Sequence, residues 1–283
     1  MSGAKTPWTV RSMVAWMQAD FEKRGIWSAR LEADLLVAHA LAVKRIALFL
    51  DPDRPLIEAE LTKIRALVER RRGHEPIAYI LGEREFYSRS FEVNRDVLIP
   101  RPDTETLIDA AKEYLREAPE GRLLDLCTGS GAIAITLALE SKRAAVATDI
   151  SAKALETAQR NAQRHSVELT LLEGDLFAAV PPEPFACVII NPPYIPAADI
   201  AGLDADVRDH EPRLALDGGP DGLDFYRRIA REVGPYLGGA LFVEIGIHQS
   251  EAVQALFREA GLTDVRAYKD LNGIERVISA RGA

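Results

Sequence analysis

The tetrapeptide Asn191-Pro192-Pro193-Tyr194 is the segment whose residue types are best suited to chemistry. It directly follows the apolar run 186–190, which is expected to be a buried strand. The prolines fix the backbone and hold Asn191 extended, so the Asn191 side-chain oxygen and the Pro192 carbonyl oxygen form two rigid acceptors. An NH2 group could donate one hydrogen to each, and Tyr194 could stack on a flat group. The pattern therefore predicts a site for a planar amide or amine.

A pair of acceptors of this kind would activate the nitrogen. An amide or aromatic amine nitrogen shares its lone pair with a π system and is therefore a poor nucleophile. Two acceptors would orient the nitrogen and favour the positive charge that grows on it during attack. A neutral Asn191, rather than an aspartate, suits a neutral donor. We therefore expect Asn191, Pro192 and Tyr194 to act in catalysis, and all four residues 191–194 to bind the substrate. The alternative is a proline-rich strand exit without chemistry.

A glycine-rich turn provides a second candidate site. Asp125 lies near the end of an expected strand, and the run Cys127-Thr128-Gly129-Ser130-Gly131 leads into an expected helix. Glycines let a ligand approach the backbone closely, and a helix N-terminus offers unpaired N–H donors. Asp149 ends the next expected strand, where a carboxylate can accept hydrogen bonds from both hydroxyls of a ribose. Asp125, residues 127–131 and Asp149 are therefore the expected cofactor-binding residues.

The glycine pattern alone leaves the ligand open. Gly129-x-Gly131-x-x-Ala134 also fits the dinucleotide fingerprint, although Asp125 would repel a diphosphate and is better placed to hold an amino group, such as that of a methionine. A tight turn without any ligand is a further alternative. Asp175 and Leu176 follow the third expected strand, and we expect them near an adenine edge, with Asn191 also close to the cofactor.

The surrounding elements predict an α/β fold. Apolar runs alternate with helical patterns, which indicates a mostly parallel sheet with helices on both faces. The expected strands are 122–126, 145–149, 168–172, 186–190, 240–244, 265–268 and 276–280, and the expected helices are 132–139, 152–164, 223–233 and 250–260. Residues 195–220 are expected to form a long loop that could act as a lid.

The first part of the chain has a different pattern. Helical spacing at 10–24, 29–42, 45–50 and 57–72 predicts a small bundle, with Trp8, Trp16 and Trp27 in its core. Short β-like runs around the turn signal Asn94-Arg95-Asp96 predict a hairpin. We therefore divide the chain into a helical domain at 1–84, a hairpin linker at 85–99 and a catalytic domain at 100–283.

Composition narrows the functional class. The 283 residues carry a net charge of −8, and 47% of them are hydrophobic, which is typical of a globular protein. No apolar run is long enough for a membrane span, and residues 1–7 lack the apolar core of a signal peptide. Cys127 and Cys187 cannot form a disulfide framework. These features predict a cytoplasmic protein, and the scattered histidines predict no metal site.

The charge is unevenly distributed. Residues 1–84 hold 14 lysines and arginines against 11 aspartates and glutamates, whereas the remainder holds 21 against 32. A protein that grips nucleic acid usually shows a strong basic face, and the run Arg70-Arg71-Arg72 is more typical of a solvated helix face. We expect no stable nucleic-acid binding and no membrane partner.

These motifs together resemble the peptide-chain release factor glutamine N5-methyltransferases, within the class I methyltransferase superfamily. The resemblance spans nearly the whole chain. It rests on Glu75-Pro76-x-x-Tyr79-Ile80-x-Gly82 with Phe86-Tyr87, on Ile99-Pro100-Arg101-Pro102-Asp103-Thr104-Glu105, on residues 125–131 and 191–194, and on Glu211-Pro212 with Ala215-Leu216-Asp217-Gly218-Gly219. Asn-Pro-Pro-Tyr is shared with DNA and RNA methyltransferases, whereas its combination with Pro-Arg-Pro-Asp-Thr-Glu is far more specific.

The resemblance implies a Rossmann-like seven-stranded domain preceded by a helical bundle and a hairpin. It implies S-adenosylmethionine as cofactor and the glutamine of a Gly-Gly-Gln loop in a release factor as substrate, with the N-terminal domain recognising that protein. Some members have glycine in place of Cys127 and an aromatic residue in place of Leu176. A DNA or RNA base amino-group methyltransferase is the alternative enzyme, and a cofactor-binding module without activity is the alternative of another class.

Overall fold

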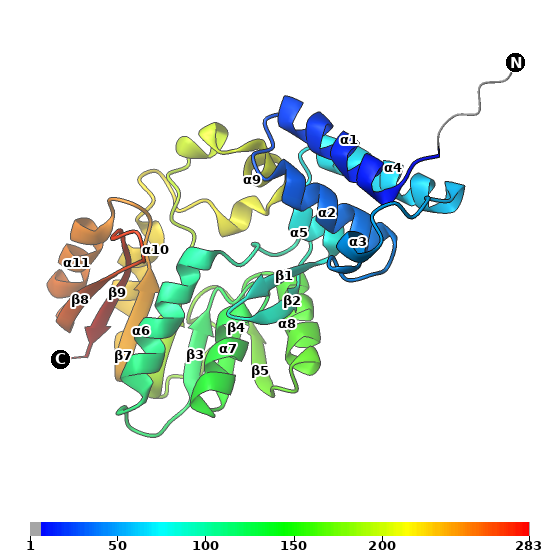
Figure 1. The fold of residues 1–283 in the computed structure, drawn as a ribbon. Coiled ribbons are helices and arrows are strands. Elements are labelled where there is room, and N and C mark those ends of the chain that lie inside the picture. Colours follow the sequence, from blue (N-terminus) through cyan, green and yellow to red (C-terminus); the bar gives the residue numbers. More distant parts are fainter. Residues whose placement is uncertain (1–6, 283) are drawn as a thin grey trace, which may run out of the picture. The chain divides into compact units, whose positions relative to one another are not determined.

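The computed structural model describes residues 7–282 and divides into two compact units, Met1–Gly82 and Glu83–Ala283 (Figure 1). The first six residues, where the sequence predicts no signal peptide, lie outside the described range. The division falls two residues before the boundary expected at position 84. Within residues 7–282, none of the helices combines the length and the apolar character that a membrane span requires.

The first unit is helical. Its elements are α1 (Val10–Lys23), α2 (Ala29–Ala40), α3 (Ala47–Leu50), α4 (Glu58–Arg72) and α5 (Ile77–Leu81). Thr9 caps helix α1, because its hydroxyl accepts a hydrogen bond from the Ser12 amide at 3.2 Å, a common way to satisfy a first-turn donor. The apolar faces of α1 and α2 pack together around Met17, Phe21 and Leu36, all fully buried. The sequence did not predict α5.

The expectation that the three tryptophans form the bundle core is wrong. Trp8 and Trp16 are 38% and 40% exposed, and Trp27 is 96% exposed. Smaller apolar residues of α1 already fill the helix interface, and Trp16 lies instead under the Arg72 guanidinium at 5.5 Å. Helical spacing shows that a residue can face a core, but it does not show which of two apolar stripes is buried.

The arginine run 70–72 is also not simply a solvated face. Arg71 is buried and pairs with Glu32 at 2.5 Å, while Arg72 pairs with Asp20 at 2.8 Å. The charges of this run are therefore largely neutralised by carboxylates within the same unit.

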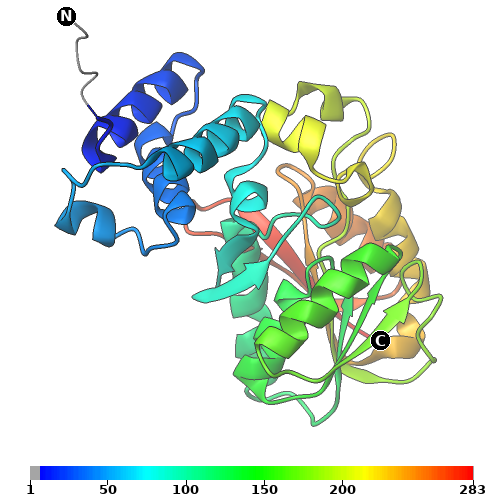
Figure 2. The same ribbon diagram turned by 90° about the vertical axis from the view of Figure 1, so that its right-hand side faces the viewer.

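The second unit contains a hairpin and an α/β sandwich, whose layers Figure 2 shows from the side. Its elements are β1 (Glu83–Phe86), β2 (Arg89–Glu92), α6 (Glu105–Leu115), β3 (Leu123–Leu126), α7 (Ala132–Ser141), β4 (Ala145–Asp149), α8 (Ala152–Arg164), β5 (Leu169–Glu173), β6 (Phe185–Ile190), α9 (Ala205–His210), α10 (Asp224–Glu232), β7 (Leu237–Glu244), α11 (Ser250–Glu259), β8 (Thr263–Lys269) and β9 (Glu275–Arg281). Each strand expected from the apolar runs is present within three residues of its predicted ends.

The sheet has the order β5-β4-β3-β6-β7-β9-β8, and only β9 runs antiparallel to its neighbours. Successive residues of one strand point to opposite faces, so Leu123 packs beneath α6 and α7 while Leu124 packs against α10 and α11. Burial on both faces explains why β6 is apolar throughout. The chain leaves β3 for β4 on one side and returns to β6 on the other. Ligands of open α/β folds bind at this kind of switch point.

The hairpin turns at Tyr87 and Ser88, not at the expected Asn94-Arg95-Asp96. Both turn residues have positive φ angles of 49° and 58°, which matches the twist of a two-residue hairpin turn. Asn94 does form a local turn, because its side chain accepts the Asp96 amide hydrogen at 2.8 Å, but no strand follows it.

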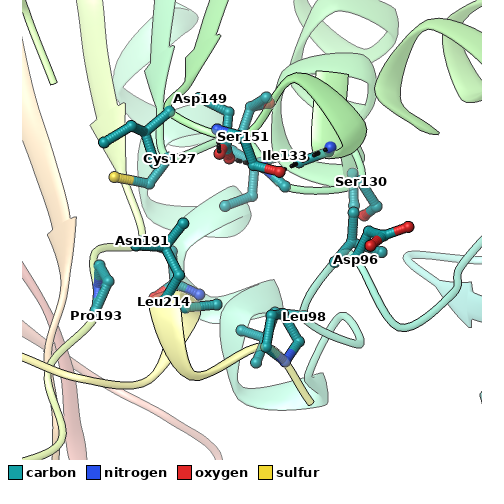
Figure 3. Close-up of a pocket in the computed structure, with 18 of the residues that line it drawn as sticks. Asp96, Leu98, Cys127, Ser130, Ile133, Asp149, Ser151, Asn191, Pro193 and Leu214 are labelled. Atoms are coloured by element: carbon teal, nitrogen blue, oxygen red, sulfur yellow. Dashed lines mark hydrogen bonds between the residues drawn. The ribbon is translucent and has the colours of Figure 1, made fainter. Parts of the chain in front are cut away.

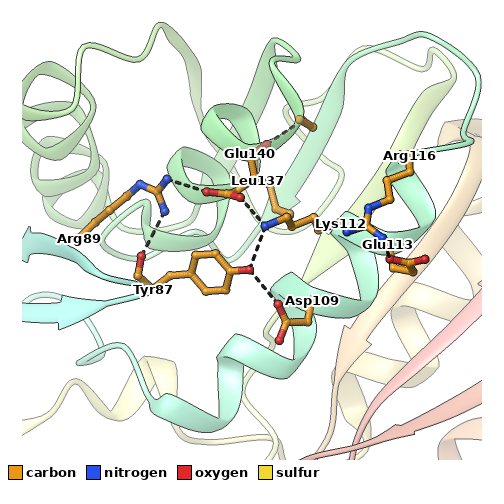
Figure 4. Close-up of polar contacts among 9 residues, drawn as sticks. Tyr87, Arg89, Asp109, Lys112, Glu113, Arg116, Leu137 and Glu140 are labelled. Atoms are coloured by element: carbon orange, nitrogen blue, oxygen red, sulfur yellow. Dashed lines mark hydrogen bonds and ion pairs between the residues drawn. The ribbon is translucent and has the colours of Figure 1, made fainter.

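The hairpin is anchored to the helices of its own unit (Figure 4). The Tyr87 hydroxyl donates to Asp109 at 2.8 Å, and Glu140 accepts hydrogen bonds from Arg89 and Lys112. A further link comes from Asn161, whose side chain accepts the Glu92 amide hydrogen and donates to the Ser130 carbonyl oxygen. Rather than forming a separate linker, the hairpin is therefore part of the second unit and is tied to its glycine turn.

Residues 195–220 form a structured excursion, although the sequence predicted a long loop. They contain α9 and two short 3-10 turns, Asp199–Gly202 and Arg213–Ala215. The buried Glu211 carboxylate accepts hydrogen bonds from the Ile99 amide at 3.1 Å and from Arg101 at 2.5 Å. These contacts hold the excursion against the segment that leads into α6.

Candidate active site

A pocket of about 310 Å³ lies at the carboxyl ends of β3, β4 and β6 (Figure 3). This volume is at the lower end of the range for small-molecule sites. The predicted site residues that line it are Cys127, Thr128, Gly129, Ser130, Asp149, Asp175, Leu176, Asn191 and Pro193. Four other predicted residues support the walls without lining them, namely Asp125, Gly131, Pro192 and Tyr194.

The glycine turn after β3 is tightly folded. Gly129 and Gly131 have φ angles of 53° and 78°, which glycine adopts without steric cost. A methyl group added at Gly131 would lie 3.1 Å from the Ala158 side chain, whereas the space beside Gly129 is open. Gly131 thus allows the turn to pack on α8, and Gly129 leaves room for a ligand to approach the backbone.

Asp125 lies beneath this turn. Its carboxylate accepts hydrogen bonds from the Thr128 hydroxyl at 2.6 Å and the Ala134 amide at 3.2 Å. Oδ1 has no hydrogen-bond partner within the described part of the chain. Complete burial raises the pKa of Asp125 to about 7, although the two hydrogen bonds oppose that rise. The residue fixes the turn from below and keeps one acceptor for a donor that enters the site.

Asp149 occupies the end of β4. Its two oxygens accept hydrogen bonds from the amides of Gly129 and Ser151, each at 2.9 Å. Burial raises its pKa, and these backbone donors oppose the rise. Each carboxylate oxygen can accept more than one hydrogen bond, so Asp149 is held rigidly and can still receive two hydroxyl donors from a ribose.

The far end of the pocket is formed by Asp175, Leu176 and two residues that the sequence did not reveal. Asp175 pairs with Arg228 of α10 at 3.0 Å, and the Arg228 guanidinium lies 5.9 Å from the ring centre of Phe225. Leu176 is buried and offers an apolar wall. The pattern of α10 indicates only an amphipathic helix, so no signal in the sequence connects Arg228 with Asp175.

Asn191 faces the pocket from the end of β6 (Figure 3). Its Nδ2 lies 3.5 Å from the Thr104 hydroxyl. Neither the Asn191 side-chain oxygen nor the Pro192 carbonyl oxygen accepts a hydrogen bond from the residues that the structure describes. Both oxygens required by the two-acceptor hypothesis are therefore without a donor from the described residues; Asn191 lines the pocket, whereas Pro192 lies behind that lining.

Tyr194 is packed from behind by the end of the 195–220 excursion. Its hydroxyl donates to Glu244 at 3.4 Å, and its carbonyl oxygen accepts from Gln249 at 2.9 Å. A methyl group at Gly218 would lie 2.8 Å from the Tyr194 backbone, so the Asp217-Gly218-Gly219 segment permits close packing here. Burial raises the pKa of the Tyr194 hydroxyl, which keeps this group neutral.

Sequence reasoning missed two groups close to Asn191 and Tyr194, namely Thr104, which lines the pocket, and the buried Glu244. Thr104 precedes the first residue of α6, but its side chain makes no capping hydrogen bond. Glu244 is 2% exposed, and burial raises its pKa to about 7 while the Thr104 hydroxyl lowers it. The only signal in the sequence was the position of Glu244 at the end of a strand.

The residues fit S-adenosylmethionine on three structural grounds. The space beside Gly129 is open, Asp125 Oδ1 lacks a donor, and Asp149 retains lone pairs at the end of β4. When bound, this cofactor supplies a methyl group activated for transfer. The chain's own residues would hold the ribose at Asp149, place the amino group near the turn above Asp125, and present a nucleophilic nitrogen at Asn191.

Comparisons with known proteins show which family the chain resembles along its length. The PrmC N-terminal domain matches residues 12–82, and the methyltransferase small domain matches residues 104–202. A release factor glutamine methyltransferase of Geobacter sulfurreducens is 44% identical over 97% of each chain. That of Caulobacter vibrioides is 39% identical, covering 95% of this chain and 96% of its own. In fold, the chain is similar to the T. thermophilus 16S rRNA N2 G1207 methyltransferase, solved in complex with AdoMet and guanosine. The TM-score is 0.52 and the sequence identity is 17%, and the match covers 71% of this chain and 50% of that one.

Proposed function

Because the chain belongs to the release factor glutamine methyltransferase family, we propose that it transfers a methyl group from S-adenosylmethionine to the side-chain nitrogen of a release factor glutamine. The acceptor is the glutamine of the Gly-Gly-Gln motif. The observation that carries the proposal is the pair of available acceptors at Asn191 and Pro192, at the end of the strand beside the glycine turn.

The proposed mechanism uses only groups of the segment 191–194. Each hydrogen of the glutamine NH2 group is donated to one acceptor, the Asn191 side-chain oxygen or the Pro192 carbonyl oxygen. Positive charge grows on the nitrogen as it attacks, and both oxygens stabilise that charge. Tyr194 supports the amide plane from the side. The leaving product is S-adenosylhomocysteine, and the methylated amide then loses a proton.

The corner also suits an exocyclic base amine, which is the alternative acceptor. Such an enzyme would flip a base into the pocket and would benefit from a basic groove. Residues 85–283 instead carry 21 lysines and arginines against 32 aspartates and glutamates. We therefore propose that the acceptor is a protein and that no stable nucleic-acid complex forms. A cytoplasmic location belongs to the same proposal, since the unpaired Cys127 and Cys187 suit a reducing compartment.

A parallel transfer assay tests the acceptor. Equal amounts of release factor, duplex DNA and structured RNA are incubated separately with the enzyme and methyl-labelled S-adenosylmethionine. We expect label in the release factor alone. Label in DNA or RNA and none in the release factor would contradict the proposal, and label in none of them would favour a binding module without activity.

We further propose that the first unit recognises the release factor. A single amide side chain is too small to provide much binding energy, so recognition requires surface away from the corner. Residues 1–84 carry a net positive charge, and the described part of this unit exposes several large apolar side chains, namely Trp27, Ile46, Phe49 and Leu50. A short peptide with Gly-Gly-Gln should therefore be a much poorer substrate than the whole release factor.

Trp27→Ala tests this assignment against a matched control. Leu271 is also fully exposed, but it lies in the turn between β8 and β9 of the second unit. We expect Trp27→Ala to raise KM for release factor by about tenfold, the effect of losing a buried aromatic anchor. Leu271→Ala should leave KM unchanged. Equal methylation of peptide and protein would contradict recognition by the first unit.

A further inference from the structure

The structure places a buried pair, Thr104 and Glu244, directly behind the amide of Asn191. Thr104 comes from the segment before α6, and Glu244 ends β7, two elements that flank the end of β6. Thr104 is 3% exposed and Glu244 is 2% exposed. Thr104 nevertheless lines the pocket together with Asn191. The Thr104 hydroxyl is therefore a buried polar group that borders the pocket beside Asn191.

The contacts form a chain with a direction. Asn191 Nδ2 donates toward the Thr104 hydroxyl over 3.5 Å. The Thr104 hydroxyl also lies beside the Glu244 carboxylate, whose pKa it lowers, and Tyr194 donates to Glu244 Oε1 over 3.4 Å. A hydroxyl has a single hydrogen. If Thr104 donates that hydrogen to a carboxylate, it can only accept from Asn191.

The direction of the hydrogen bond between Asn191 and Thr104 decides whether the oxygen or the NH2 group of the Asn191 amide faces the substrate. Either rotamer of an asparagine amide fits the same space, but only one places its NH2 group on Thr104. In that rotamer the Asn191 oxygen is directed away from Thr104 and is available to the substrate. The opposite rotamer would present an NH2 group to the substrate NH2 group, and the two donors would repel each other.

We propose that Thr104 and Glu244 are positioning residues that hold the Asn191 amide in its acceptor orientation. This inference rests on the proposed role of Asn191 and adds two residues to it. The distance from Asn191 Nδ2 to the Thr104 hydroxyl, 3.5 Å, is long for a hydrogen bond, so the bond restrains the amide only weakly. Glu244 Oε2 has no hydrogen-bond partner within the described part of the chain, so the carboxylate has the capacity to accept the Thr104 hydrogen.

Thr104→Val tests the proposal, because it removes the hydroxyl and keeps the shape. We expect kcat on release factor to fall about tenfold, which is the effect of one hydrogen bond, while the Kd for S-adenosylmethionine stays unchanged and the Tm falls by no more than about 2–4 °C. Thr104→Ser retains the hydroxyl and should restore most of kcat. Thr136→Val is the matched control. Thr136 is fully buried in α7, and its hydroxyl has no partner within the described residues, so this change should leave kcat unaltered.

A double-mutant cycle separates positioning from general damage to the fold. In an Asn191→Ala background there is no amide to orient, so Thr104→Val should cause no further loss of kcat. Glu244→Gln should lower kcat less than Thr104→Val and should add nothing to it. Equal losses from Thr104→Val with and without Asn191 would overturn the proposal, as would a Thr104→Ser variant as slow as Thr104→Val. A wild-type enzyme that does not methylate release factor would instead refute the proposed function.

Discussion

The two sides of the pocket differ in the length of their hydrogen bonds. On the glycine-turn side, Asp149 and Asp125 accept hydrogen bonds of 2.6 to 3.2 Å from the turn, from the start of α7 and from the segment after β4. On the Asn191 side, the contacts to Thr104 and between Tyr194 and Glu244 are 3.5 and 3.4 Å long. The short hydrogen bonds hold the side chains of the first side in place. On the second side, the NH2 group of the substrate would supply the hydrogen-bond donors. We therefore expect substitutions on the first side to act on binding and those on the second to act on turnover.

Asn191→Ala should have the largest effect. It removes one of two acceptors that stabilise charge in the transition state, so kcat should fall by about 10²-fold or more. The Kd for S-adenosylmethionine should barely change, because the cofactor is held mainly from the other side. Steady-state kinetics with release factor, together with calorimetry, measure both quantities. If Asn191→Ala weakened only the binding of S-adenosylmethionine and left kcat unchanged, the two sides of the pocket would not differ in function.

Asp149→Ala should give the opposite result. We expect the Kd for S-adenosylmethionine to rise by about 10- to 100-fold, equivalent to roughly 1.5–3 kcal/mol for hydrogen bonds to a charged group. The kcat at saturating cofactor should change far less. Calorimetric titration checks this prediction, and an unchanged Kd would show that Asp149 only braces the glycine turn.

Asp125→Asn should change stability in a pH-dependent manner. Burial raises the folded-state pKa of Asp125 from 3.8 to about 7, so the folded state holds this proton more tightly than the unfolded state. The resulting stabilisation is complete below about pH 4 and is lost as the pH rises through 7. At 1.36 kcal/mol for each pKa unit, the loss is up to about 4 kcal/mol.

Asparagine does not titrate, and its unpartnered amide costs about 1–3 kcal/mol. We therefore expect Asp125→Asn without ligand to be more stable than wild type at pH 8 by about 1 kcal/mol, or roughly 2–4 °C in Tm. This advantage should disappear near pH 5. Thermal unfolding at both pH values tests it, and a constant difference would show that Asp125 does not titrate in this range.

Tyr194→Phe should have the smallest effect. The variant keeps the ring that supports the amide plane and loses only the long hydrogen bond to Glu244. We expect kcat to stay within about threefold, since an exposed or stretched hydrogen bond contributes little. Tyr194→Ala should be slower than Tyr194→Phe. If the kcat of Tyr194→Phe were as low as that of Tyr194→Ala, the hydroxyl of Tyr194, and not its ring, would be the group that supports catalysis.

The sequence predicted best what is local. The apolar runs located all seven strands of the main sheet, and strand ends identified Asp149 and Asn191 as residues of one sheet edge. Local turn chemistry also located the glycine turn. Those signals depend on neighbours within a few residues, and tertiary contacts did not override them.

The remaining features depend on pairs that are distant in sequence. Asp175 meets Arg228, and Thr104 meets Asn191, across 53 and 87 positions. No spacing rule connects such residues. The hairpin turn was misplaced because Asn94 is a stronger turn former than Tyr87, and the tryptophans were misplaced because helical spacing cannot tell which apolar stripe is buried. The roles of the site residues themselves remain predictions.

Localisation of the transferred methyl group tests the central claim most directly. Release factor is incubated with S-adenosylmethionine and either wild-type enzyme or Asn191→Ala, and fragmentation mass spectrometry then locates the modification. The account predicts one added methyl group on the Gly-Gly-Gln glutamine side chain with wild type, formed at least about 10²-fold more slowly with Asn191→Ala. A methyl group on another residue, or equal rates for the two enzymes, would contradict it.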